Sequence, residues 1–133
     1  MEKFGEALGW AAAVCYFAAV ANLFIKQIFR AYIAKLPADN LWKRRYQLLM
    51  KLIVKYHRYF GIGAGVFALS HLCWQIAYVR LAYTGVLVTA LMAVTVLLGV
   101  FVFNGKKRSL TGAHRMLSLT VLAVLLLHML AKL

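Results

Sequence analysis

Two stretches of the chain, HRYFGIGAGVFALSH at residues 57–71 and HRMLSLTVLAVLLLH at residues 114–128, share one pattern. Each begins with His-Arg, continues through twelve further residues and ends on a second histidine. The chain has only four histidines, and all four stand at the ends of these two stretches. The second stretch follows the first at an offset of 57 residues, so the pattern is an internal repeat.

The histidine spacing within each stretch is typical of one face of an α-helix. At about 100° a residue, the fourteen steps between the two histidines come within roughly 40° of four whole turns. At 1.5 Å a residue, the two side chains lie about 21 Å apart along the helix axis. Because the apolar core of a bilayer is about 30 Å thick, each histidine is expected a short way inside one boundary of that core.

The composition indicates an integral membrane protein. Hydrophobic residues make up 65% of the 133 residues, against roughly 45–50% in a soluble domain. Only Glu2, Glu6 and Asp39 are acidic, and the net charge is +13. The basic residues flank apolar stretches instead of forming a soluble basic face, so the sequence predicts membrane lipids and not nucleic acid as the partner.

All 133 residues are predicted to form one all-α domain, an integral membrane four-helix bundle with up-down-up-down topology. The predicted spans lie at about residues 8–25, 52–78, 83–103 and 110–131. Asn104-Gly105 is a turn signal after the third of these spans.

A basic amphipathic helix is predicted at about residues 41–56, with Trp42, Tyr46, Leu49, Ile53 and Tyr56 on one face. It is either an interfacial helix or a cytoplasmic extension of the second span, and the absence of a strong breaker favours the continuous helix.

The boundary before this segment has its own signals. The helix of the first span is expected to run to about Lys35 and to stop at Pro37, and Asp39 or Asn40 is a candidate N-cap for the next helix.

Basic residues are divided very unequally between the two ends of the predicted bundle. Nine of them lie in the hairpin 26–58, and four more follow the third span: Lys106, Lys107, Arg108 and Arg115. The opposite end has only three: Lys3, Arg80 and Lys132. Because basic loops stay in the cytoplasm, both termini are predicted outside a bacterial or archaeal cytoplasmic membrane. The basic hairpin is expected to face anionic lipid, with an acidic protein partner as the alternative.

The second and fourth spans cross in the same direction, so the histidines are predicted to pair between repeats, His57 with His114 and His71 with His128. Two neutral imidazoles can hold the iron of a b-type haem from both sides. The sequence therefore predicts two haem b groups stacked between the second and fourth helices. A zinc ion would need four ligands converging on one point, which the spacing along each helix prevents.

Glycines and arginines complete the predicted haem site. Gly85 and Gly99 are fourteen residues apart on the third span and could make room for the haem planes, with ordinary helix packing as the alternative. Arg58 and Arg115 each follow a cytoplasmic-side histidine and are candidates for binding haem propionates. Their alternative role is the anchoring of cytoplasmic loops. On the outer side, Arg80, Lys132 and Gln75 are candidate contacts for the outer haem or a quinone.

These histidine frames resemble the bis-histidine transmembrane cytochromes b. In the four-helix core of respiratory cytochrome b, two helices each carry two histidines at this kind of spacing, and glycines on a neighbouring helix make room for haem. The HR-x12-H phrase also looks like ferric-reductase-type membrane domains and, more loosely, the cytochrome b561 group.

The resemblance covers the second to fourth spans and implies four axial ligands: His57, His71, His114 and His128. The first span has no informative motif, because it lacks a glycine pair fourteen residues apart. The flavin and nicotinamide domain of ferric reductases and the quinone-site loops of respiratory cytochrome b have no counterpart in the sequence.

The first predicted function is electron transfer across the membrane through two haems, between a quinone pool and a redox partner. The sequence leaves open whether the chain acts alone, as a homodimer or within a larger respiratory-type complex. A second hypothesis is a self-contained haem oxidoreductase of the ferric reductase or superoxide oxidase type, so enzymatic activity also stays open. A third is a haem-free structural or assembly subunit whose histidines form hydrogen bonds between helices.

Overall fold

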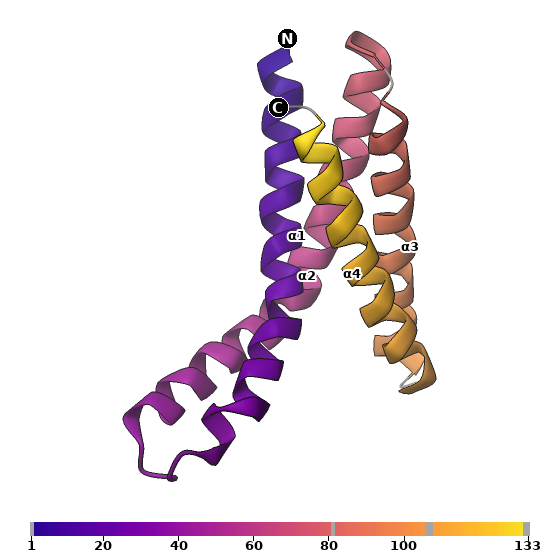
Figure 1. Ribbon diagram of the computed structural model, residues 1–133. Coiled ribbons are helices and arrows are strands. Elements are labelled where there is room, and N and C mark those ends of the chain that lie inside the picture. The colour runs from indigo at the N-terminus through magenta and orange to yellow at the C-terminus, as the bar shows by residue number, and fades with distance from the viewer. Residues whose placement is uncertain (1, 81, 106–107, 132–133) are drawn as a thin grey trace.

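The computed structural model describes residues 2–80, 82–105 and 108–131, and these residues form an all-helical protein (Figure 1). The helices are α1 (Glu2–Ala31), α2 (Leu41–Tyr78), α3 (Tyr83–Gly105) and α4 (Arg108–Leu130), with a short 3-10 helix η1 (Ile33–Lys35). Four segments of the described chain are long and apolar enough to cross a membrane: Lys3–Lys35, Leu41–Tyr78, Tyr83–Gly105 and Ser109–Leu130. The prediction of an all-α protein with four membrane-length helices is confirmed.

Successive helices run in opposite directions and form two hairpins side by side (Figure 1). The helix α1 packs along α2, α3 packs along α4, and α2 also contacts α3, whereas α1 only touches α4. Within the described residues α2 and α4 do not pack directly against each other, so the two histidine-bearing helices face each other across the bundle. We call the end at which α3 ends and α4 begins the basic end, and the opposite end the terminal end.

A central layer of buried side chains, one from each helix, divides the bundle between these two ends. Ala64 and Val121 are 0% exposed, Met92 is 2% exposed and Tyr16 is 4% exposed. Ala64 and Val121 each stand seven residues from both histidines of their own helix, which is about 10 Å along the axis. The Tyr16 hydroxyl donates a hydrogen bond to the backbone carbonyl of Ser118, which ties α1 to α4. The layer therefore separates two histidine levels.

The helix boundaries confirm the expected continuity of α2 and change two details. The helix α2 runs unbroken from Leu41, so the basic amphipathic segment is an extension of the second span. The helix α1 ends at Ala31, earlier than predicted, and η1 occupies the residues up to Lys35. The predicted turn residues Asn104 and Gly105 belong to the last turn of α3. Three residues of the charge count, Lys106, Lys107 and Lys132, lie outside the described chain.

The α1–α2 hairpin continues beyond the bundle at the basic end as an arm, residues 26–56 (Figure 1). At 1.5 Å a residue the 38 residues of α2 span about 57 Å, far more than a bilayer core of about 30 Å. The connection is closed by Lys43, whose Nζ donates to the carbonyls of Ala34 and Leu36 at 3.1 and 2.7 Å. Tyr46 donates to the Ile25 carbonyl at 3.0 Å, so the two arm helices are joined along their length.

Replacement of Asn40 by alanine tests how α2 begins. The Asn40 side chain accepts hydrogen bonds from the backbone N–H groups of Trp42 and Lys43 at 2.8 and 3.4 Å. Loss of such a cap costs about 1 kcal/mol, so we expect faster hydrogen exchange at these two amides and little change in the rest of the bundle. An Asn40→Asp variant keeps the acceptor and should exchange at the original rate; equally fast exchange in both variants would argue against the cap.

Candidate functional site

Three of the histidines hold their Nδ1 atoms against backbone carbonyls of a neighbouring helix. The N···O distances are 2.9 Å from His57 to Ala19, 2.8 Å from His71 to Gly5 and 3.0 Å from His114 to Thr95. A carbonyl can only accept, so Nδ1 carries the proton in each of these rings. A neutral ring protonated on Nδ1 keeps a lone pair on Nε2, which is the form that binds a metal.

His128 has a side-chain partner where the other three have a carbonyl. Its Nδ1 atom lies 2.8 Å from Oγ1 of Thr84 on α3. A hydroxyl can donate or accept, so this contact fixes the ring orientation without fixing the tautomer. All four histidines are thus oriented through Nδ1 by α1 or α3, the helices that carry no histidine.

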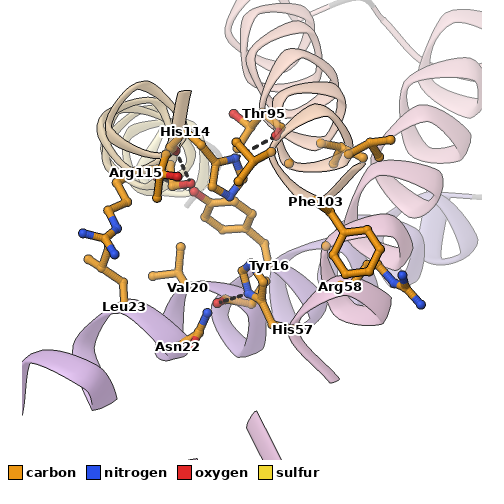
Figure 2. Close-up of a pocket in the computed structure, with 18 of the residues that line it drawn as sticks. Tyr16, Val20, Asn22, Leu23, His57, Arg58, Thr95, Phe103, His114 and Arg115 are labelled. Carbon is orange, nitrogen blue, oxygen red and sulfur yellow. Dashed lines mark hydrogen bonds between the residues drawn. The ribbon is translucent and has the colours of Figure 1, made fainter. Parts of the chain in front are cut away.

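The imidazoles of His57 and His114 lie close together at the basic end. Their ring centres are 6.3 Å apart, and the ring planes are inclined at 84°. Figure 2 shows the two rings on α2 and α4, with Tyr16 of α1 beside them. Two metal–nitrogen bonds of about 2 Å each, together with the distance from each nitrogen to its ring centre, account for a separation of this size. The separation of the ring centres therefore matches that of two imidazoles that bind one metal ion from opposite sides.

Three glycines lie directly against histidine rings. A Cβ atom added at Gly99 would lie 3.1 Å from Cε1 of His114, and one added at Gly85 would lie 3.2 Å from Cε1 of His128. A Cβ at Gly9 would likewise lie 3.1 Å from Cε1 of His71. These distances are shorter than ordinary carbon–carbon contacts of about 3.5–4.0 Å. The space that Gly85 and Gly99 leave open is thus taken up by the imidazoles themselves.

The helix α1 contributes more to the site than the sequence indicates. It supplies the carbonyls of Gly5 and Ala19, which are fourteen residues apart like the histidines that donate to them. Gly9 and Gly85, which contact the histidines of the terminal end, are 76 residues apart, as are the acceptor residues Ala19 and Thr95. The two hairpins therefore hold their histidines in equivalent ways. Every residue has a carbonyl, so only the 76-residue relation of the two glycines offered a signal in the sequence.

A cavity of about 670 Å³ opens at the basic end between all four helices. His57, His114 and Gly99 line it, together with Gly61, at which an added Cβ would meet no atom within 4 Å. Cofactor pockets in proteins commonly measure about 300–1,000 Å³, so the cavity has the size of a cofactor site.

Four basic side chains line this cavity, and none of the described residues around it is acidic. Arg58 lies over the rings of Phe103 and Tyr59, at 4.7 and 5.3 Å from their centres. Lys26 on α1 is close enough to Arg115 and Arg30 for their positive charges to repel one another. Three like charges without a nearby carboxylate favour an anionic ligand.

Of the arginines predicted from sequence, both line the cavity, and Lys26 and Arg30 were missed. Their signal was the four-residue spacing at the end of the first span, which places them on one helix face.

The described residues include no group of three or more His, Cys, Asp or Glu side chains that could hold one metal ion. The described residues thus bring His57 and His114 close together, and they hold His71 and His128 at the opposite end of a bundle of membrane-length helices. No protein-family model, curated protein or solved structure matches this chain. The function is accordingly inferred from the geometry of these histidines.

Proposed function

We propose that the protein is a membrane cytochrome b that holds two b-type haems and passes electrons between the two ends of its helix bundle. The hydrogen bonds at Nδ1 of the histidines carry this proposal. Histidines that only join helices can form their hydrogen bonds through either ring nitrogen. Metal-binding histidines characteristically bind the metal through one ring nitrogen and donate the N–H of the other to a carbonyl. All four rings use Nδ1, and the Nε2 atoms of His57, His71 and His114 keep a lone pair.

His57 and His114 would hold the haem of the basic end, and His71 and His128 the haem of the terminal end. The iron of each haem supplies one-electron chemistry by alternating between the ferric and ferrous states. The protein contributes the axial nitrogens, and the backbone carbonyls increase their basicity. The central layer of Tyr16, Ala64, Met92 and Val121 keeps water out of the space between the two levels.

The basic side chains at the cavity would bind the haem propionates. One basic cluster at the cavity consists of Lys26, Arg30 and Arg115. No acidic residue occurs among the described residues that line the cavity. Arginine is well suited to carboxylates because its planar guanidinium can form two parallel hydrogen bonds. Arg58 is held over two aromatic rings, which makes it the weaker candidate of the two arginines.

A quinone and a redox protein remain the proposed exchange partners. At the terminal end, Trp74 Nε1 and Gln75 Oε1 are buried, and no partner for them occurs in the described part of the chain. Both residues lie against Gly5, whose carbonyl accepts from His71. Because Trp74 Nε1 is covered by α1, a quinone could accept a hydrogen bond from it only after α1 and α2 move apart.

An optical spectrum of the purified protein tests the proposal. Expression with ample haem should give a reduced b-type spectrum and about two haems per chain, one for each histidine pair. A colourless protein would refute the proposal and support a structural role of the histidines. Reduction of ferric iron or oxidation of superoxide by the purified protein alone would instead favour the self-contained oxidoreductase.

The Thr84 hydroxyl provides a specific test at the terminal end. Thr84→Val removes the group that contacts Nδ1 of His128, so we expect roughly 10–100-fold weaker retention of one haem. Thr84→Ser should retain that haem because it keeps the hydroxyl. The matched control is Thr120→Val, because the Thr120 hydroxyl donates to Met116 of its own helix. Equal haem loss in Thr84→Val and Thr120→Val, measured by haem transfer to apomyoglobin, would contradict the assignment.

A further inference from the structure

The arm has an unpartnered face as well as a face that packs on α1. Its packed side includes Tyr46 and Ile53, which are half-buried and face α1. Part of the predicted apolar stripe therefore serves the hairpin itself. Trp42 and Leu49, assigned to the same stripe from sequence, are 73% and 48% exposed. The exposed side of the arm thus presents its own pattern.

Apolar side chains form one stripe on this exposed side. Leu41, Leu48, Leu52 and Tyr56 follow one another at steps of seven, four and four residues, which keeps them on one helix face. Their exposed fractions are 67%, 65%, 57% and 40%. The exposed Arg45, four residues after Leu41, lies on the same face. Trp42 and Leu49 lie at the edge of this stripe. A row of exposed leucines on a well-packed hairpin indicates a partner that covers it.

A basic stripe runs beside the apolar stripe. Arg44, Lys51 and Lys55 repeat the same steps as Leu41, Leu48 and Leu52, three residues later in the helix, so they lie about 60° around its axis. The arm contains one acidic residue, Asp39, against eight basic ones between Lys26 and Lys55. Leucines and aromatic residues flanked by lysine and arginine are the pattern of helices that lie in a membrane interface.

We propose that the arm lies along the surface of an anionic leaflet at the basic end of the bundle. The apolar stripe would enter the boundary between headgroups and acyl chains, and the basic stripe would bind lipid phosphates. The arm leaves the bundle obliquely and points away from α3 and α4, which brings it over the surrounding lipid (Figure 1). Charge complementarity selects anionic lipid, and the exposed leucines favour a lipid surface over a soluble acidic protein.

Spin labels on the full chain in lipid nanodiscs test this proposal. Cys15 and Cys73 are free thiols and would first be replaced by serine. Labels at Leu52→Cys and Lys51→Cys, whose side chains point about 100° apart around the helix, then report the apolar and the basic stripe. In discs that contain phosphatidylglycerol, the label at 52 should become several-fold less accessible to a water-soluble nickel chelate than the label at 51. Discs of phosphatidylcholine alone should show a smaller difference.

Charge removal provides the matched comparison. The variant with Arg44→Gln, Lys51→Gln and Lys55→Gln, labelled at residue 52, should lose the dependence on anionic lipid. The variant with Lys3→Gln and Arg80→Gln at the terminal end, labelled at the same residue, should keep it. Equal nickel access at residues 51 and 52 in anionic discs would overturn the proposal, and so would dipolar coupling between labels of two chains, which would indicate a second copy. Haem content is measured in parallel and is independent of this outcome, so failure of the arm proposal leaves the haem proposal intact.

Discussion

His57→Ala is expected to remove one of two haems and to leave the other in place. His114→Ala should give the same spectrum, because the ring centres of His57 and His114 lie 6.3 Å apart and the two side chains would bind one iron. His71→Ala and His128→Ala should form a second pair with the complementary spectrum. The haem-to-protein ratio should fall to about half in each case, since a haem that loses one of two axial ligands is held far more weakly. Pyridine haemochrome spectra of the four variants measure this.

Met116→Ala is the control for the histidine variants. Met116 is 74% exposed and lies two residues from His114 on α4, so its replacement should leave both haems bound. A common phenotype for His57→Ala and His71→Ala, distinct from that of the other two, would show that the pairs form within each repeat. Full haem content in all four variants would refute axial ligation by these residues.

Gly99→Val is expected to displace the haem of the basic end while the haem of the terminal end stays bound. The new Cβ would lie 3.1 Å from Cε1 of His114, and the branched methyl groups would add to this overlap. Gly99→Ala should have the smaller effect, because a shift of the His114 ring by a few tenths of an ångström relieves the contact. For Gly99→Ala we expect roughly 10–100-fold weaker binding of the basic-end haem. Gly85→Val should act in the same way on the haem held by His128.

Gly112→Val is the matched control for the glycine variants. Gly112 lies only two residues before His114, but an added Cβ would meet no atom within 4 Å. A helix gains stability when glycine is replaced by most other residues, so this variant should fold and retain both haems. If Gly99→Val keeps the basic-end spectrum unchanged, then Gly99 serves helix packing alone. Haem stoichiometry and the positions of the absorption bands distinguish these results.

The number and extent of the helices could be predicted from the sequence. The apolar spans were long enough to identify, and the structure begins α3 at Tyr83 and ends α2 at Tyr78, close to the predicted limits. The end of α1 at Ala31 was less predictable, because residues 32–35 still have a helical composition and only local geometry selects η1. Asp39 and Asn40 were both candidate caps from the sequence, and the structure shows that Asn40 caps α2.

The contribution of α1 could not be predicted. The fourteen-residue spacing of Gly85 and Gly99 has no counterpart in α1, because Leu23 stands fourteen residues after Gly9. The groups that α1 supplies to His57 and His71 are carbonyls, which leave no mark in the sequence. For the same reason, the cluster of Lys26 and Arg30 with Arg115 emerged only when α1 and α4 were placed beside one cavity.

The sequence by itself determined the four membrane-length helices, the two histidine levels and the concentration of basic residues at one end. Covalent geometry is sufficient for these, because a fixed rise and rotation per residue place side chains in depth and direction along a helix. The pairing of His57 with His114 was predicted from the parallel course of the second and fourth spans, and their ring centres lie 6.3 Å apart in the structure. The tertiary structure decided that α1 and α3 orient the rings through Nδ1, and that glycines lie against the imidazoles. These features depend on which helices are neighbours, and side-chain packing and backbone hydrogen bonds between helices determine that arrangement.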